Sequence, residues 1–168
     1  MEVFIIAAQT ADGFIGRDKD HISTQWTSKE DSKFFMQKTK EAGVVVMGRT
    51  TYETVGKPLP NRLNVVYTSN PEAIETADNL ITTDQPPQQL INSLTNKQYD
   101  QVAICGGSSI YRMFMEAGVV DSLFLTVEPI LFGTGIPLFD KSMESQLNLK
   151  QIHQLSDQTV VMEYGIKG

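Results

Sequence analysis

The sequence predicts an α/β fold: a single domain with a mixed, mostly parallel sheet, flanking helices and an antiparallel hairpin at the C-terminal end. Three observations lead to this prediction. Short apolar runs recur along the chain, which is typical of strands buried on both faces. Segments with helix start and stop signals separate these runs, so strands and helices alternate. The final segment alternates apolar and polar residues around a polar turn, as a hairpin does. The length, residues 1–168, fits one domain.

The first half of the chain is expected to supply three strands and two helices. Apolar runs predict strands at residues 3–8, 44–48 and 64–68. Helices are expected at 27–43 and 49–55, and an exposed polar loop at 17–25. The first helix starts with a capping box, for which Thr27 and Glu30 are one candidate pair. Ser28 and Asp31 are the other. Gly43 can end this helix in a left-handed conformation.

The second half is expected to be richer in strands. Strands are predicted at residues 79–82, 101–105 and 122–128, followed by a hairpin formed by 148–154 and 159–166. Helices are predicted at 86–94 and 108–117. The first of these has proline in its first turn, and Gly118 ends the second. Residues 129–137 are expected to form a loop.

The composition excludes several classes of protein. Fourteen Lys and Arg against 20 Asp and Glu give a net charge of −6, so a basic nucleic-acid surface is not expected. One cysteine cannot form an internal disulfide, and two distant histidines with that cysteine make no convincing metal site. Neither a signal peptide nor a membrane span is evident. We therefore expect a cytoplasmic protein without metal, nucleic-acid or membrane binding, and favour a monomer.

Two junctions between a strand and a helix carry glycine: Gly48-Arg49-Thr50-Thr51 and Cys105-Gly106-Gly107-Ser108-Ser109. Backbone amides at a helix start attract anions, and glycine lets a ligand approach closely. Each junction alone is equally well explained by a helix cap or tight packing. Together they favour a phosphate-bearing ligand across the carboxyl ends of the strands. Neither matches the standard dinucleotide or triphosphate fingerprint.

Two charged residues are candidates for ligand contacts. Asp31 lies one helical turn before Phe35, so both can share a face. An acid in a first turn usually complements the helix dipole, but an inward-facing carboxylate could bind an amidine-like ring edge. Pro58 and Pro60 stiffen the segment before Arg62. That arginine is either a carboxylate or phosphate anchor or a solvated loop residue.

The motifs jointly resemble the dihydrofolate reductase family over nearly the whole chain. The resemblance is carried by Ile6-Ala7-Ala8 with Asp12-Gly13-Phe14-Ile15-Gly16, Trp26 five residues before Asp31, Phe35, residues 47–53, Pro58-Leu59-Pro60-Asn61-Arg62, Thr68-Ser69, Cys105-Gly106-Gly107 with Tyr111, and Leu125-Thr126. It implies NADPH-dependent reduction of 7,8-dihydrofolate to tetrahydrofolate by hydride transfer to pterin C6. In that family the acid binds the pterin and the arginine binds the glutamate carboxylate of the substrate.

The resemblance also implies a set of site residues. Catalytic roles fall on Trp26, Asp31, Tyr111 and Thr126. Substrate contacts are expected from Ile6, Ala8, Asp31, Phe35, Val55, Leu59, Arg62 and Thr126. Cofactor contacts are expected from Ala8, Ile15, Gly16, Gly48, Arg49, Thr50, Thr51, Thr68, Ser69, Cys105, Gly106, Gly107, Ser108, Ser109, Ile110 and Tyr111.

Other stretches point to a second family. Residues 10–13, 27–31 and 118–139 are similar to the reductase domain of riboflavin biosynthesis, which shares the fold and the nicotinamide cofactor. A pyrimidine reductase is therefore the first alternative, and a catalytically silent nucleotide-binding module is the second. Ser32, Thr50 and Ser109 also depart from residues found in some dihydrofolate reductases. The segment from Pro58 to Arg62, the spacing of Trp26 and Asp31, and Thr126 favour folate.

Overall fold

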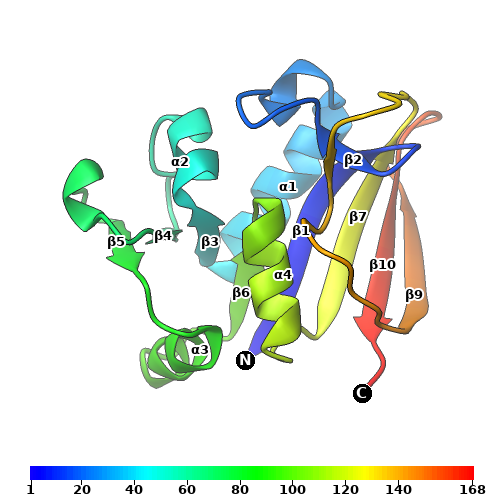
Figure 1. Ribbon diagram of the computed structural model, residues 1–168. Coiled ribbons are helices and arrows are strands. Elements are labelled where there is room, and N and C mark those ends of the chain that lie inside the picture. Colours follow the sequence, from blue (N-terminus) through cyan, green and yellow to red (C-terminus); the bar gives the residue numbers. More distant parts are fainter.

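An eight-stranded sheet runs through the centre of the computed structural model, which describes residues 1–168 (Figure 1). The strands follow the order β5-β4-β3-β6-β1-β7-β10-β9. They are β1 (Glu2–Thr10), β3 (Val44–Gly48), β4 (Leu63–Tyr67), β5 (Leu80–Thr83), β6 (Gln101–Ile104), β7 (Ser122–Glu128), β9 (Leu147–Gln154) and β10 (Val160–Ile166). All pairs from β5 to β7 are parallel, whereas β10 pairs antiparallel with both β7 and β9. The predicted mixed sheet with a C-terminal hairpin is confirmed.

Helices cover both faces of the parallel part of the sheet. They are α1 (Lys29–Ala42), α2 (Arg49–Val55), α3 (Pro87–Asn96) and α4 (Ser108–Glu116). Residues of α3 and α4 belong to one buried cluster, and residues of α1 pack against a second cluster on the opposite face. Figure 1 shows α4 in front of the sheet and α1 behind it. No helix is both long and apolar enough to cross a membrane.

Strand β3 shows why the apolar runs are continuous. Val44 and Val46 belong to the cluster on the α3 and α4 side, while Val45 and Met47 belong to the cluster on the α1 side. All four are at most 1% exposed. A strand between two helical layers is buried on both faces, so each of its side chains must be apolar. The same reasoning applies to β1 and β6.

The ends of α1 are set by local sequence. Ser28 is the N-cap, and its Oγ accepts a hydrogen bond from the Asp31 backbone N–H at 3.1 Å. Of the two candidate capping pairs, the structure therefore uses Ser28 with Asp31. Gly43 ends the helix with φ +74°, a conformation that glycine adopts without steric cost.

The segment 129–137 differs from its prediction as a loop. Ile136–Pro137 (β8) pairs antiparallel with Phe14–Gly16 (β2) in a separate two-stranded sheet. Asp12 supports this arrangement, since its carboxylate accepts hydrogen bonds from the backbone N–H groups of Phe132 and Gly133 at 3.2 and 2.7 Å. A two-residue strand has no hydrophobic period, and contacts with residues far along the chain decide its pairing.

Phe114 on α4 offers a test of this core. Its side chain is fully buried and meets the Tyr67 ring edge to face at 5.8 Å between centroids. We expect Phe114→Ala to lower the free energy of unfolding by about 3–5 kcal/mol, measured by urea denaturation, because it leaves a cavity in a dense core. Leu149→Ala, at a site that is 55% exposed, should change it by less than about 0.5 kcal/mol. Equal effects would contradict the assigned core.

Candidate active site

The predicted site residues follow the carboxyl ends of the parallel strands. Gly48 ends β3, Thr68 follows β4, Cys105 follows β6, and Thr126 lies near the end of β7. Strands β1 and β7 are in a register that pairs Ala8 with Thr126. Because parallel strands point the same way, these residues lie along one edge of the sheet, where α/β proteins bind ligands.

Close backbone contact joins the two glycine junctions. The Gly48 N–H donates to the Gly106 carbonyl oxygen at 2.8 Å. A Cβ atom at Gly48 would lie 3.1 Å from Ile110 Cγ1, and one at Gly106 would lie 3.1 Å from the Tyr111 hydroxyl oxygen. Tight packing is therefore one reason for the glycines. Gly48 and Gly107 are also the N-caps of α2 and α4, and neither helix receives a side-chain cap. The first amides of these helices thus fit a phosphate-bearing cofactor.

Asp31 lies in the first turn of α1, and its side chain is turned inward. The residue is 8% exposed, which is unusual for an acid that merely complements a helix dipole. Burial raises the pKa of its carboxyl. The hydroxyl of Thr126 opposes this shift, the nearby Glu128 carboxylate adds to it, and the hydroxyl of Thr27 opposes it again. Asp31 thus holds a desolvated carboxyl beside hydroxyl donors from the sheet and from the preceding loop.

Trp26 stands at the end of the loop that precedes α1. Its ring stacks on His21 at 6.5 Å and meets the Phe132 ring edge to face at 5.2 Å, both between centroids. Arg17 lies over Phe132, with the guanidinium carbon 4.2 Å from the ring centroid. The buried Trp26 Nε1–H has no hydrogen-bond partner in the protein. A buried indole N–H normally finds a partner, so this donor is available to a ligand.

Arg62 is only 4% exposed, so the structure excludes a solvated loop arginine. Its Nε donates to the Pro60 carbonyl oxygen at 3.0 Å, and Nη1 donates to the Thr39 hydroxyl and to the Met36 carbonyl oxygen on α1. These contacts fix the guanidinium against α1. They involve only two of its three nitrogens, and Nη2 has no partner in the protein.

Two asparagines hold the turn that carries Arg62. The Asn64 side chain accepts from the Leu59 N–H at 2.9 Å and donates to the carbonyl oxygens of Leu59 and Arg62 at 2.9 and 3.1 Å. Asn79 donates to the same two carbonyl oxygens. Sequence reasoning missed Asn64, Asn79 and Thr39. An amide at the start of an otherwise apolar strand was the available signal for Asn64, since buried polar groups need partners.

Tyr111 is buried and Cys105 is half-buried near the second junction. The Tyr111 hydroxyl donates to the Ile6 carbonyl oxygen at 3.0 Å and so ties α4 to β1. Burial raises the pKa of this phenol well above its ordinary value. Burial also raises the pKa of the Cys105 thiol to about 12. The thiol therefore stays protonated at neutral pH, which fits a small pocket-lining residue better than a nucleophile.

Several predicted contacts lie at the rim instead. Arg49 pairs with Glu53 at 2.6 Å, and both side chains are about half exposed. The remaining exposed members of the predicted set are Thr50, Val55, Ser69 and Ser109. Of the other predicted residues, Thr51, Thr68 and Ile15 are half-buried, while Gly16 and Ser108 are buried. The structure therefore leaves the exposed members of the predicted set, such as Thr50 and Ser69, available to solvent or ligand.

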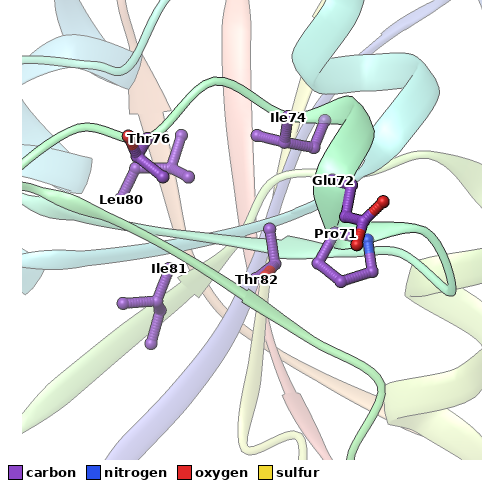
Figure 2. Close-up of a pocket in the computed structure, with 7 residues that line it drawn as sticks. All are labelled: Pro71, Glu72, Ile74, Thr76, Leu80, Ile81 and Thr82. Carbon is purple, nitrogen blue, oxygen red and sulfur yellow. The ribbon is translucent and has the colours of Figure 1, made fainter.

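Two surface hollows can be compared with the predicted site. One, of about 250 Å³, lies between the loop before α1 and α2, and is lined by Asp20, Ile22, Thr50, Glu53 and Thr54. The other, of about 580 Å³, lies between residues 71–76 and the edge strand β5. Figure 2 shows the second one, and none of its lining residues belongs to the predicted set.

Comparison with known proteins identifies the family. The family model for dihydrofolate reductase matches residues 2–157. The chain belongs to the dihydrofolate reductase family. It is therefore an NADPH-dependent oxidoreductase, and the glycine junctions described above fit that cofactor. A dihydrofolate reductase from Enterococcus faecalis, solved in complex with NADP(H) and RAB-propyl, is 25% identical with a TM-score of 0.74. The match covers 99% of this chain and 97% of that one.

Two further relatives are similar over nearly their full length. A putative riboflavin biosynthesis protein from Shewanella sp. PV-4 is 21% identical with a TM-score of 0.81, and the match covers 100% of both chains. At that identity the likeness shows a shared fold. The uncharacterized protein YwjB of Bacillus subtilis is 25% identical over 166 residues, which cover 94% of this chain and 93% of that protein.

The buried carboxyl predicts a pH-dependent stability. When folding raises the pKa of an acid, the folded protein becomes less stable as pH rises from the unfolded pKa, near 3.8, through the folded pKa. At pH 7 the folded protein therefore carries the full destabilising contribution of ionised Asp31. We expect Asp31→Asn to raise the free energy of unfolding at pH 7, with a gain that shrinks as pH falls toward 3.8. Urea denaturation at several pH values measures this difference.

Glu30→Gln is the matched control, because Glu30 lies in the same turn of α1 but is exposed. It should show no such pH-dependent gain. A gain for Asp31→Asn that is equally large at pH 4 and pH 7 would argue against ionisation of Asp31 as the cause.

Proposed function

We propose that the protein reduces 7,8-dihydrofolate to 5,6,7,8-tetrahydrofolate with NADPH. One observation carries the choice of substrate: the polar groups arranged along one face of α1. Asp31, Phe35 and Thr39 are spaced four residues apart, so they recur on one face of the helix over about 12 Å. Thr39 accepts a hydrogen bond from Arg62. This face thus offers a carboxyl at one end, an aromatic ring in the middle and a guanidinium at the other end.

That order of groups complements an elongated ligand with an amidine-like ring at one end and a carboxylate at the other. The Asp31 carboxyl can accept two N–H bonds from the ring edge of a pterin. Phe35 and Leu59, both packed against the cluster on the α1 side, supply apolar contacts for the middle of the ligand. The free Nη2 of Arg62 then binds the carboxylate of the tail. A fixed guanidinium suits this because its other contacts already hold Nη2 in place and its charge strengthens the hydrogen bond.

NADPH, when bound, supplies the hydride that reaches pterin C6. The chain's contribution is to hold the two rings in register and to manage the proton that N5 gains. Asp31 sits on the amidine edge of the ring, away from N5, so it orients and polarises the pterin while a water delivers the proton. The contacts of Trp26 with His21 and Phe132 hold the loop of residues 17–25 close to the start of α1. Alignment in a partly dry pocket is the main source of rate.

A pyrimidine reductase of the riboflavin pathway is the second candidate. It is favoured by the sequence of residues 131–139, Leu-Phe-Gly-Thr-Gly-Ile-Pro-Leu-Phe, which resembles that family. Such a substrate carries a ribose or ribitol phosphate and would need a cluster of cations near Asp31. Arg62 is a fixed cation against α1 and Lys38 is half-buried over the Phe4 and Phe124 rings, whereas Lys29, Lys33 and Lys40 are exposed, so no cluster of cations surrounds Asp31. A catalytically silent module is the third candidate, and the buried Asp31 carboxyl argues against it.

Steady-state assays separate the three candidates. We expect NADPH oxidation with dihydrofolate, blocked by a diaminopyrimidine antifolate, and none with a phosphorylated ribosylamino-pyrimidine.

Asp31→Asn should reduce turnover at neutral pH by about 100-fold or more, because the ring loses its ionisable partner. The dissociation constant for NADPH, measured by nicotinamide fluorescence, should be unchanged. Unaltered turnover in this variant would remove Asp31 from the mechanism, and activity with the pyrimidine alone would favour the second candidate.

The role of Arg62 is tested by the two Michaelis constants. Arg62→Leu should raise the KM for dihydrofolate by about 10–100-fold, because it removes a charge-assisted contact, and change the KM for NADPH little. Lys57→Leu, which removes an exposed cation from the same segment, is the matched control. Circular dichroism verifies that both variants fold. Equal increases in the two constants would mean that Arg62 does not bind the substrate tail.

A further inference from the structure

A second buried carboxylate lies beside Asp31, at the end of β7. Glu128 is 3% exposed. Its Oε1 accepts hydrogen bonds from the Ser28 N–H and the Ser28 hydroxyl, both at 2.8 Å. Its Oε2 accepts one from the Thr159 hydroxyl at 3.1 Å. Glu128 therefore connects the first residue of the α1 cap to β7 and to the turn before β10, across 100 residues of sequence.

This connection changes how the helix cap works. In a complete capping box, the acid three residues after the N-cap reaches back to the N-cap N–H. Ser28 and Asp31 have the required spacing, and Ser28 Oγ does accept from the Asp31 N–H. The return bond, however, is made by Glu128 Oε1 in place of Asp31. The Asp31 carboxyl is thereby free to face the site while the helix start remains fully satisfied.

We propose that Glu128 is a positioning residue for Asp31: it takes over the return bond of the capping box, fixes the start of α1 on the sheet and places a second negative charge beside the Asp31 carboxyl. The inference rests on the proposed function, because it concerns how Asp31 meets the substrate. It has a geometric part, which is the contact with Ser28, and an electrostatic part, which is the pair of buried acids. The two parts are separable by substitution.

The electrostatic part has few competing groups. The Glu128 carboxylate raises the pKa of Asp31, after the larger effect of burial. The phenol of Tyr111, from α4, also lies close enough to respond to the charge of Asp31. On α1 itself, Lys29 and Glu30 are the adjacent charges, and both are exposed to solvent. Lys38, two turns further along, is half-buried over the Phe4 and Phe124 rings. Glu128 is thus the one buried anion that acts on the candidate catalytic carboxyl.

Glu128→Gln separates charge from geometry. Glutamine has the same size, its oxygen can accept from Ser28, and its amide can donate to Thr159. We expect the midpoint of the pH dependence of kcat/KM for dihydrofolate that reports ionisation of Asp31 to move acidward by roughly one unit, since a like charge is removed. Glu128→Ala, which removes the bond to Ser28 as well, should lower the plateau value of kcat/KM about tenfold or more, and Glu128→Gln should retain most of it.

Glu163→Gln is the matched control for the charge. Glu163 is a partly buried acid on the neighbouring strand β10, but it pairs with His153, whose Nε2 lies 2.8 Å from its Oε2. This variant should leave the pH midpoint in place. A midpoint for Glu128→Gln that coincides with those of the unmodified protein and of Glu163→Gln would overturn the electrostatic part. An unchanged kcat/KM in Glu128→Ala would overturn the geometric part.

A second measurement needs no substrate, so it distinguishes failure of this inference from failure of the proposed function. The rise in midpoint temperature caused by Asp31→Asn at pH 7 is measured in the unmodified protein and in the Glu128→Gln background. We expect a clearly smaller rise in the Glu128→Gln background, because the repulsion is already gone. Equal rises would overturn the coupling of the two acids whatever the substrate is. A smaller rise in a protein that does not reduce dihydrofolate would uphold the coupling and reject only the proposed function.

Discussion

The burial of a carboxyl on α1 is the constraint from which the rest of the candidate site follows. Asp31 loses most of its hydration, so its ionised form depends on hydrogen bonds from neighbouring groups. Thr126 on β7 and Thr27 before the helix supply them. Thr27 is close along the chain, whereas Thr126 is within reach because the start of α1 is held against the end of β7 by the contact between Ser28 and Glu128. A helix cap and a strand end are therefore parts of one electrostatic arrangement.

At the opposite end of the α1 face lies a buried cation, Arg62, in a protein whose net charge is negative. The net charge of −6 favours any cation in general, but it would repel the anionic substrate proposed above. Under that proposal, Arg62 offsets the repulsion locally. Backbone carbonyl oxygens and the Thr39 hydroxyl orient the guanidinium, and Asn64 keeps its turn rigid. Because the donors are aimed before the ligand arrives, little side-chain entropy is lost on binding.

Local patterns predicted the fold better than the site. Apolar runs and helix stops such as Gly43 located almost every element, because burial on two faces and left-handed ends have short-range signatures. The pairing of β2 with β8 was missed, since long-range contacts decide it. Asp31 and Arg62 were found as charged residues in stiff or capped settings. Glu128 and Asn64 were missed because their partners are set by tertiary structure. The signal in the sequence was a polar residue at the terminus of an apolar strand, at the start for Asn64 and at the end for Glu128.

The proposed choice of substrate rests on the face of α1 rather than on the sheet. The glycine junctions at β3 and β6 are required for close packing as well as for a dinucleotide, so they do not discriminate between one acceptor molecule and another. The same sheet also occurs in a protein named for riboflavin biosynthesis. What can discriminate is the spacing along α1, where two turns separate Asp31 from the residue that holds Arg62. Under the proposed function, this spacing suits an elongated ligand with a ring at one end and a carboxylate at the other, rather than a compact pyrimidine phosphate.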